Sequence, residues 1–185
     1  MSTPVLIAII VTAAIVCAAL LFFGFQLQSK RLHDKFGPEY ERSVSELGRS
    51  KAEAELHRRE KRVSRMQIRP LSDSDRNRFA SAWRSVQASF VDDPGGSLTQ
   101  ANRLLTEVMA ARGYAVGDFD ECAANISVNH AVAVTDYRDA HEIAIRCERS
   151  EASTEDIRRA LVQYRTLLEA LLAAPAIERA RSATA

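Results

Sequence analysis

The hydrophobic positions of this chain follow two patterns, one continuous and one periodic. The continuous run extends from Val5 to Phe25 (VLIAIIVTAAIVCAALLFFGF), and none of its 21 residues is charged. A helix of this length is roughly 31 Å long, which matches the hydrocarbon thickness of a bilayer. An apolar surface on all sides of a helix is typical of contact with lipid. The pattern predicts a transmembrane helix over residues 5–25, preceded by a short tail of residues 1–4.

A cleaved signal peptide and a lipoprotein anchor fit the same run less well. A cleaved signal peptide has a basic start, an apolar core of about 7–15 residues and a small-x-small cleavage site. This chain begins MSTP, its apolar run is longer, and FFGFQLQ is a poor cleavage sequence. A lipoprotein needs small residues before its modified cysteine, whereas Ile15 and Val16 precede Cys17. The sequence favours an uncleaved anchor, and an exported domain behind a signal peptide is the alternative.

The charges that flank the run predict its orientation. No basic side chain precedes it, whereas Lys30, Arg31 and Lys35 follow it with a single acid, Asp34, among them. Cytoplasmic flanks of membrane helices carry the excess of Lys and Arg. We therefore expect a single-pass protein of the cell membrane with its N-terminus outside and its C-terminal domain in the cytoplasm. An exported or periplasmic domain is the alternative.

Residues 26–70 are strongly charged and carry an irregular apolar stripe. Leu47 and Ala54 are one heptad apart, as are Leu56 and Val63, but the register slips between the two pairs. The residue before a proline disfavours helix, so the pattern ends at Pro70. It predicts a basic juxtamembrane helical stalk containing one amphipathic helix of about 25–30 residues. That helix is either a solvated spacer or part of a short coiled coil.

Residues 71–174 show helical periodicity in several consecutive segments. Phe79, Trp83, Val86 and Phe90 are spaced as one face of a helix, and no stretch has the alternation of a strand. The expected helices cover about residues 72–90, 97–111, 119–126, 129–149 and 153–173. The predicted fold class is all-α: one transmembrane helix, a charged helical stalk and a four- to five-helix bundle. Residues 175–185 are expected to be a disordered tail.

Charge is distributed unevenly along this nearly neutral chain. Residues 30–70 contain 12 Lys and Arg against 7 Asp and Glu, whereas residues 71–185 contain 13 against 17. Lys and Arg close to an anionic lipid surface gain about 1 kcal/mol each, so the lipid bilayer is an expected partner. The run from His57 to Arg62 is interleaved with acids and lacks stacking aromatics, so nucleic acid is not expected as a partner.

No motif in the chain indicates catalysis, metal binding or a cofactor. His130 and His141 are 11 residues apart, or some 16 Å along a helix, which is too far to share one metal ion. Gly95 and Gly96 lack the Lys-Ser/Thr of a phosphate-binding loop. We therefore predict no catalytic residue, metal ligand or cofactor, and we identify no small-molecule substrate. The sequence favours a protein that is not an enzyme.

Two hypotheses of function follow. The favoured one is a protein-interaction or scaffolding module at the cytoplasmic membrane face, which binds an unknown protein partner or a second copy of itself. The alternative is a ligand-binding or enzymatic helical domain that uses Asp136, His141 and two surface loops, Asp92–Asp93 and Arg112–Tyr114. The candidate interaction or loop positions are Trp83, Asp92, Asp93, Arg112, Tyr114, Asp136 and His141.

Two sequence patterns carry a resemblance. The chain contains W-x-x-V-Q-x-x-F-V-D-D-P from Trp83 to Pro94, then R-G-Y from Arg112 to Tyr114, and His141 further on. Over roughly residues 30–173 it resembles a family of uncharacterised bacterial membrane-anchored proteins with one N-terminal span and a helical domain. The chain has Ala115 where the pattern usually has proline. The resemblance implies the same architecture and brings no activity, cofactor or site.

Overall fold

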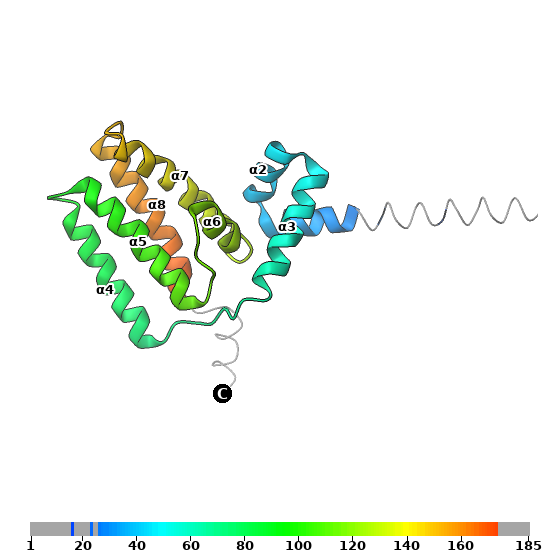
Figure 1. Cartoon of the computed structure of the whole chain (residues 1–185), viewed down its shortest axis with the longest axis horizontal. Helices are drawn as coiled ribbons and strands as arrows, with labels where there is room; N and C mark the ends of the chain where they lie inside the picture. Colours follow the sequence, from blue (N-terminus) through cyan, green and yellow to red (C-terminus); the bar gives the residue numbers. More distant parts are fainter. Residues whose placement is uncertain (1–15, 17–22, 24–25, 174–185) are drawn as a thin grey trace, which may run out of the picture.

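The structure is a computed structural model that describes residues 16, 23 and 26–173, and all regular structure in these residues is helical (Figure 1). Residues 26–36 form the first fully described helix. The helices that follow are α2 (Pro38–Leu47), α3 (Arg49–Val63), α4 (Asp73–Ser89), α5 (Pro94–Arg112), α6 (Phe119–Ser127), α7 (Ala131–Glu148) and α8 (Thr154–Leu172). The predicted all-α class is confirmed for this part of the chain.

Most of the predicted membrane span, residues 5–25, lies outside the described residues, as do the predicted tails at residues 1–4 and 175–185. Among the helices that the structure describes, none is long and apolar enough to cross a membrane.

Helices α4 to α8 form the predicted helical bundle. The α8 helix contacts both α7 and α5, while α4 lies against α5 and α6 against α7. Phe79, Trp83 and Val86 are buried in the core of this bundle, so the aromatic stripe on α4 is a packing face. The bundle is therefore the hydrophobic unit that the periodicity of the distal segments predicts.

Several helices of the bundle begin where a side chain caps the first helical turn. The Ser72 hydroxyl accepts from the Asp75 amide, and Ser153 and Asp156 form a reciprocal capping box. The α5 helix begins at Pro94, three residues earlier than predicted, because Asp93 caps it there and proline suits the first helical position.

The predicted single stalk helix is wrong. Gly48, with φ of +76°, ends α2 at Leu47, and α3 begins at Arg49 and folds back along α2 (Figure 1). Residues 26–36, α2 and α3 form a small helical unit with its own core, which we call the N-terminal unit (residues 26–63). Its most deeply buried side chains include Leu32, Phe36 and Leu56. Leu56 and Val63 of the predicted stripe are buried in this core, whereas Leu47 and Ala54 are exposed.

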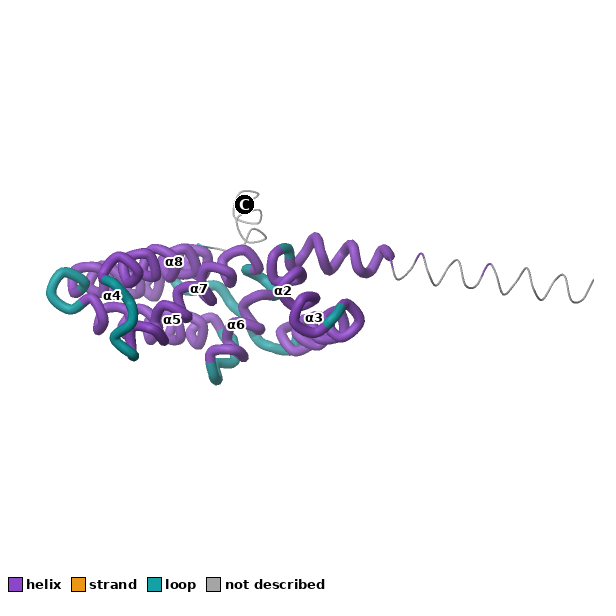
Figure 2. The backbone as a smooth tube through the Cα atoms, turned by 90° about the horizontal axis from the view of Figure 1, so that it is seen from above, coloured by secondary structure: helices purple, strands orange, loops and turns teal. Residues whose placement is uncertain are grey.

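The linker between the N-terminal unit and the bundle lies against the end of α5. Gly113 has φ of +90°, and a Cβ built on it would overlap the Gln67 carbonyl oxygen. The Arg69 amide donates to the Arg112 carbonyl at 2.9 Å. Only glycine allows this approach, which places the N-terminal unit beside α6 and α7. Figure 2 shows the unit at one end of the bundle, with its first helix directed away from it.

Candidate functional site

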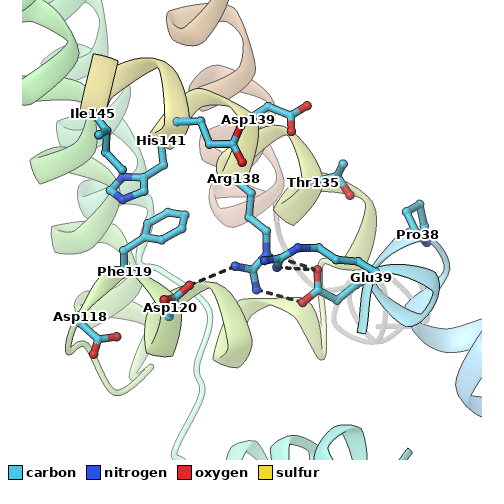
Figure 3. Close-up of a pocket in the computed structure, with 12 residues that line it drawn as sticks. Pro38, Glu39, Asp118, Phe119, Asp120, Thr135, Arg138, Asp139, His141 and Ile145 are labelled. Carbon is cyan, nitrogen blue, oxygen red and sulfur yellow. Dashed lines mark hydrogen bonds and ion pairs between the residues drawn. The ribbon is translucent and has the colours of Figure 1, made fainter. Parts of the chain in front are cut away.

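A buried carboxylate joins the N-terminal unit to the bundle. Glu39, in the first turn of α2, is 2% exposed. It accepts a hydrogen bond from Arg59 of α3 at 2.9 Å and two from Arg138 of α7, at 2.9 Å and 3.3 Å. Arg138 also reaches Asp120 of α6 at 3.4 Å (Figure 3). We call Glu39, Arg59 and Arg138 the junction cluster, because it joins three helices from two parts of the fold.

A second polar contact joins the same two parts. The Arg62 guanidinium donates to the Asn125 side-chain oxygen at 2.8 Å, and the Asn125 amide donates to the Ala115 carbonyl at 3.1 Å. Asn125 is fully buried. Because this contact involves α3 and α6 whereas Arg138 joins α2 to α7, the N-terminal unit is attached to the bundle through two pairs of helices.

A groove of about 490 Å³ opens beside the junction cluster. Such a volume is within the usual range for ligand sites. Its walls come from α2, from the start of α6 and from one face of α7 (Figure 3). We call it the α6–α7 groove, and its lining residues are Pro38, Glu39, Arg42, Asp118, Phe119, Asp120, Thr135, Arg138, Asp139, His141, Glu142 and Ile145.

Two stacked aromatic rings line this groove. The Phe119 and His141 rings have centroids 3.5 Å apart and planes within 9° of parallel (Figure 3). Burial lowers the pKa of His141, and the opposing effect of the Asp120 and Glu148 carboxylates does not outweigh it. The imidazole is therefore neutral at neutral pH. Its buried Nδ1 atom has no hydrogen-bond partner among the described residues.

The rim of the groove has an excess of negative charge. Five of its lining residues are Asp or Glu, against two arginines. Glu39 and Asp120 are both paired with Arg138, so the lining carboxylates without an ion pair among the described residues are Asp118, Asp139 and Glu142. Burial raises the pKa of Asp139, and repulsion from Glu142 and Asp136 raises it further. A cation placed in the groove would reduce this repulsion.

The structure brings only one of the seven predicted candidate residues, His141, into the groove. Asp136 lies on the same helix but does not line the groove, and Trp83 is core. His130 precedes α7 and lies near Arg112, so the two histidines are in different surroundings. The composite site that the alternative hypothesis required is therefore not assembled.

The four loop candidates lie at the two ends of α5. Asp93 accepts from the Gly96 amide at 2.9 Å as the helix cap, with Asp92 beside it. At the other end Arg112 is buried and donates to the Leu171 carbonyl at 2.6 Å. The Tyr114 hydroxyl accepts from Asn129 at 3.0 Å. A helix of 19 residues separates the two pairs by roughly 28 Å, so they do not form one site.

Most residues of the α6–α7 groove were not predicted from the sequence. Arg138, His141 and Ile145 recur at helical spacing on one face of α7, with Asp139 and Glu142 beside them, and this spacing is a signal that the sequence contained. Phe119 carried no such signal, because its partner is on another helix. In the part of the chain that the structure describes, no group of three His, Cys, Asp or Glu side chains could hold a metal ion.

Replacing the buried carboxylate should destabilise the junction. Glu39→Gln removes the negative charge that Arg59 and Arg138 share, and breaking a buried ion pair costs about 3 kcal/mol. Hydrogen exchange of the full chain in detergent should speed up in α2 and α3 more than in α8. The matched control, Glu46→Gln, breaks an exposed pair with Arg42 and should cost less than about 1 kcal/mol. Equal effects of the two variants would contradict this account.

The half-buried His130 should make stability depend on pH. Burial, with a smaller contribution from the Arg112 charge, lowers the pKa of His130 to about 4. Between pH 6.5 and 4 the unfolded chain binds a proton here that the folded chain does not, so stability falls as pH drops through this window. The loss is on the order of 3 kcal/mol.

The measurement is denaturant unfolding followed by the fluorescence of Trp83, the single tryptophan of the chain. His130→Gln has no imidazole to protonate and should lose less stability than the wild type over this window. The same pH slope in both proteins would show that His130 has no part in it.

No family model matches this chain, and neither the curated proteins nor the solved structures searched contain a match. The resemblance to bacterial membrane-anchored proteins therefore stays a prediction from the sequence.

Proposed function

We propose that this chain is a single-pass membrane protein whose helical domain binds a partner protein at the cytoplasmic face, through the α6–α7 groove. The observation that carries the proposal is the groove itself, which is lined by the stacked rings of Phe119 and His141 and by carboxylates. Aromatic rings next to carboxylates suit a partner segment that presents a cationic side chain. An arginine fits best, because its guanidinium both stacks on rings and pairs with carboxylates.

The membrane anchor in this proposal is the apolar run of residues 5–25. The described part of the chain is helical from residue 26, directly after the run, and this helix carries Lys30, Arg31 and Lys35. Those charges support a cytoplasmic position for the rest of the chain.

The junction cluster supports a role as a rigid platform. Glu39 is bound to both α3 and α7, so the groove is held in a fixed position relative to the first helix of the N-terminal unit. A binding surface that is ordered before the partner arrives loses less conformational entropy on binding than a flexible one. A membrane-anchored protein built in this way would present its groove at a defined distance from the bilayer.

A second candidate function, ligand binding, has one observation in its favour. The lowered pKa of His141 and the raised pKa of Asp139 occur in the same groove, and such shifts are frequent at functional sites. Among the described residues, however, no hydrogen bond joins His141 to another side chain, so no oriented acid–base pair is present. The groove favours binding over catalysis.

Reporter fusions test the proposed orientation. A phosphatase that is active only outside the cytoplasm should be inactive when fused after Ala185, and a fluorescent protein that folds only inside should be bright there. Fusions before Met1 should give the opposite pattern. An active phosphatase at the C-terminus would overturn the cytoplasmic assignment and favour the exported alternative.

Site-specific photo-crosslinking tests the proposed binding surface. A photoreactive phenylalanine in place of Ile145, which lines the groove and is 37% exposed, should trap one defined partner in cells. The same probe in place of Val91, which is 81% exposed in the turn between α4 and α5, should trap none. A covalent dimer would identify the partner as a second copy of this chain.

Charge reversal on the rim provides the specificity control. Asp139→Lys and Glu142→Lys change exposed side chains, so the fold should persist while a cationic partner is repelled. Trapping at position 145 should then be lost. Trapping that survives both substitutions, or that is equal at positions 145 and 91, would contradict the proposal.

A further inference from the structure

The turn between α2 and α3 is exposed, and its side chains are not part of the core of the N-terminal unit. Every residue from Ser45 to Lys51 is exposed. Leu47 at its tip is 44% exposed, and a Cβ built on Gly48 would meet no atom within 4 Å. The tip therefore presents an apolar side chain to the surroundings.

The turn lies beside the start of the first described helix. Arg49 lines one shallow pocket together with Gln26 and Ser29. The Glu53 carboxylate joins the two segments, because the same oxygen accepts hydrogen bonds from Ser29 at 2.5 Å, Tyr40 at 2.9 Å and Arg49 at 3.2 Å. In Figure 1 the turn is on the side of the N-terminal unit that faces away from the bundle, as the start of the first described helix is.

The position of the first described helix, directly after the proposed span, determines how far the α2–α3 turn lies from the bilayer core. Residues 26–29 follow directly after the proposed span and extend about 6 Å along a helix axis. The headgroup layer on each side of a bilayer is roughly 5–8 Å thick. A helix along the membrane normal therefore places Ser29 in this layer, and the turn bound to it through Glu53 is at the same level.

The side chains at this level suit an anionic lipid surface. Leu27 on the first described helix is 62% exposed, and Leu47 at the tip of the turn is exposed as well. Among the described residues, Lys30 and Lys51 pair with no carboxylate, whereas the acid Glu46 next to the tip is bound to Arg42. Exposed apolar side chains next to unpaired lysines are typical of surfaces that lie on anionic membranes.

We infer that the α2–α3 turn places Leu47 in the headgroup layer of an anionic membrane and forms a second attachment point beside the anchor. This inference rests on the membrane anchor proposed above. One span alone leaves a domain free to rotate and tilt. Two contacts fix the N-terminal unit on the membrane surface and, through the Glu39 junction, orient the α6–α7 groove.

Tryptophan fluorescence in quencher-labelled vesicles tests the inference with the full chain. The wild type has one tryptophan, Trp83, which is buried in the bundle and supplies an unquenched baseline. Separate variants add an indole at the tip (Leu47→Trp), next to the anchor (Leu27→Trp) or in the turn between α4 and α5 (Val91→Trp). Each is reconstituted into phosphatidylglycerol vesicles with and without brominated acyl chains.

The expected result is loss of most of the added emission at positions 47 and 27, and none at position 91. Quenching at 27 alone would overturn the inference and leave the anchor intact. A blue-shifted, unquenched indole at 47 would also overturn it, because protein would then cover the tip. An unquenched indole at position 27 would remove the anchor, and with it both proposals.

A charge variant separates lipid attraction from simple proximity. Lys51→Glu reverses an exposed charge next to the tip, and it should reduce quenching at position 47 while leaving quenching at position 27 unchanged. Raising the salt concentration should act in the same direction, since it screens attraction to the anionic surface. Quenching at 47 that is insensitive to both changes would overturn the role assigned to the lysines.

Discussion

Glu39 is a buried carboxylate that is shared by arginines from two different helices, and the positions of the larger parts of this fold depend on it. An isolated carboxylate loses several kcal/mol of hydration free energy on burial, which is recovered only with well-placed counter-charges and hydrogen bonds. Here Arg59 and Arg138 supply both, so α2 is stable in this position only when α3 and α7 are in theirs. The carboxylate therefore specifies the arrangement more than it adds to stability.

This specification matters because few apolar side chains connect the hydrophobic cores of the two parts. The N-terminal unit and the bundle have separate hydrophobic cores, which are joined by Val128 at the end of α6, buried in the core of the N-terminal unit, and by Met66 and Ile68 of the linker, packed against both. A small apolar contact permits several similar orientations, whereas two guanidinium groups bind one carboxylate in few geometries. The Arg62–Asn125 contact adds a second directional constraint at α6. Together these polar contacts define the shape of the α6–α7 groove.

The features predicted correctly from the sequence depend on neighbours in the chain. Ser72 and Ser153 start helices through bonds to residues three positions later, and the α4 stripe is buried because its spacing matches a helix. Features that depend on distant residues were missed. Glu39 and Arg138 are 99 residues apart, and nothing near Glu39 in the sequence distinguishes it from an ordinary acid in a first helical turn. Gly48 is unfavourable within a helix, but predicting the fold-back required knowledge that α2 and α3 pack against each other.

The division of charge along the chain has a counterpart in space. The basic segment forms the N-terminal unit and the acidic segment forms most of the groove, yet the junction pairs Glu39 of the basic segment with Arg138 of the acidic one. Each part thus buries a side chain whose charge is opposite to the net charge of that part. The exposed side chains that remain leave the N-terminal unit basic and the groove acidic. At physiological ionic strength these fields fade over about 8 Å, so each surface acts on its own surroundings. An anionic bilayer would then attract the N-terminal unit and repel the groove, which leaves the groove open to a cationic partner.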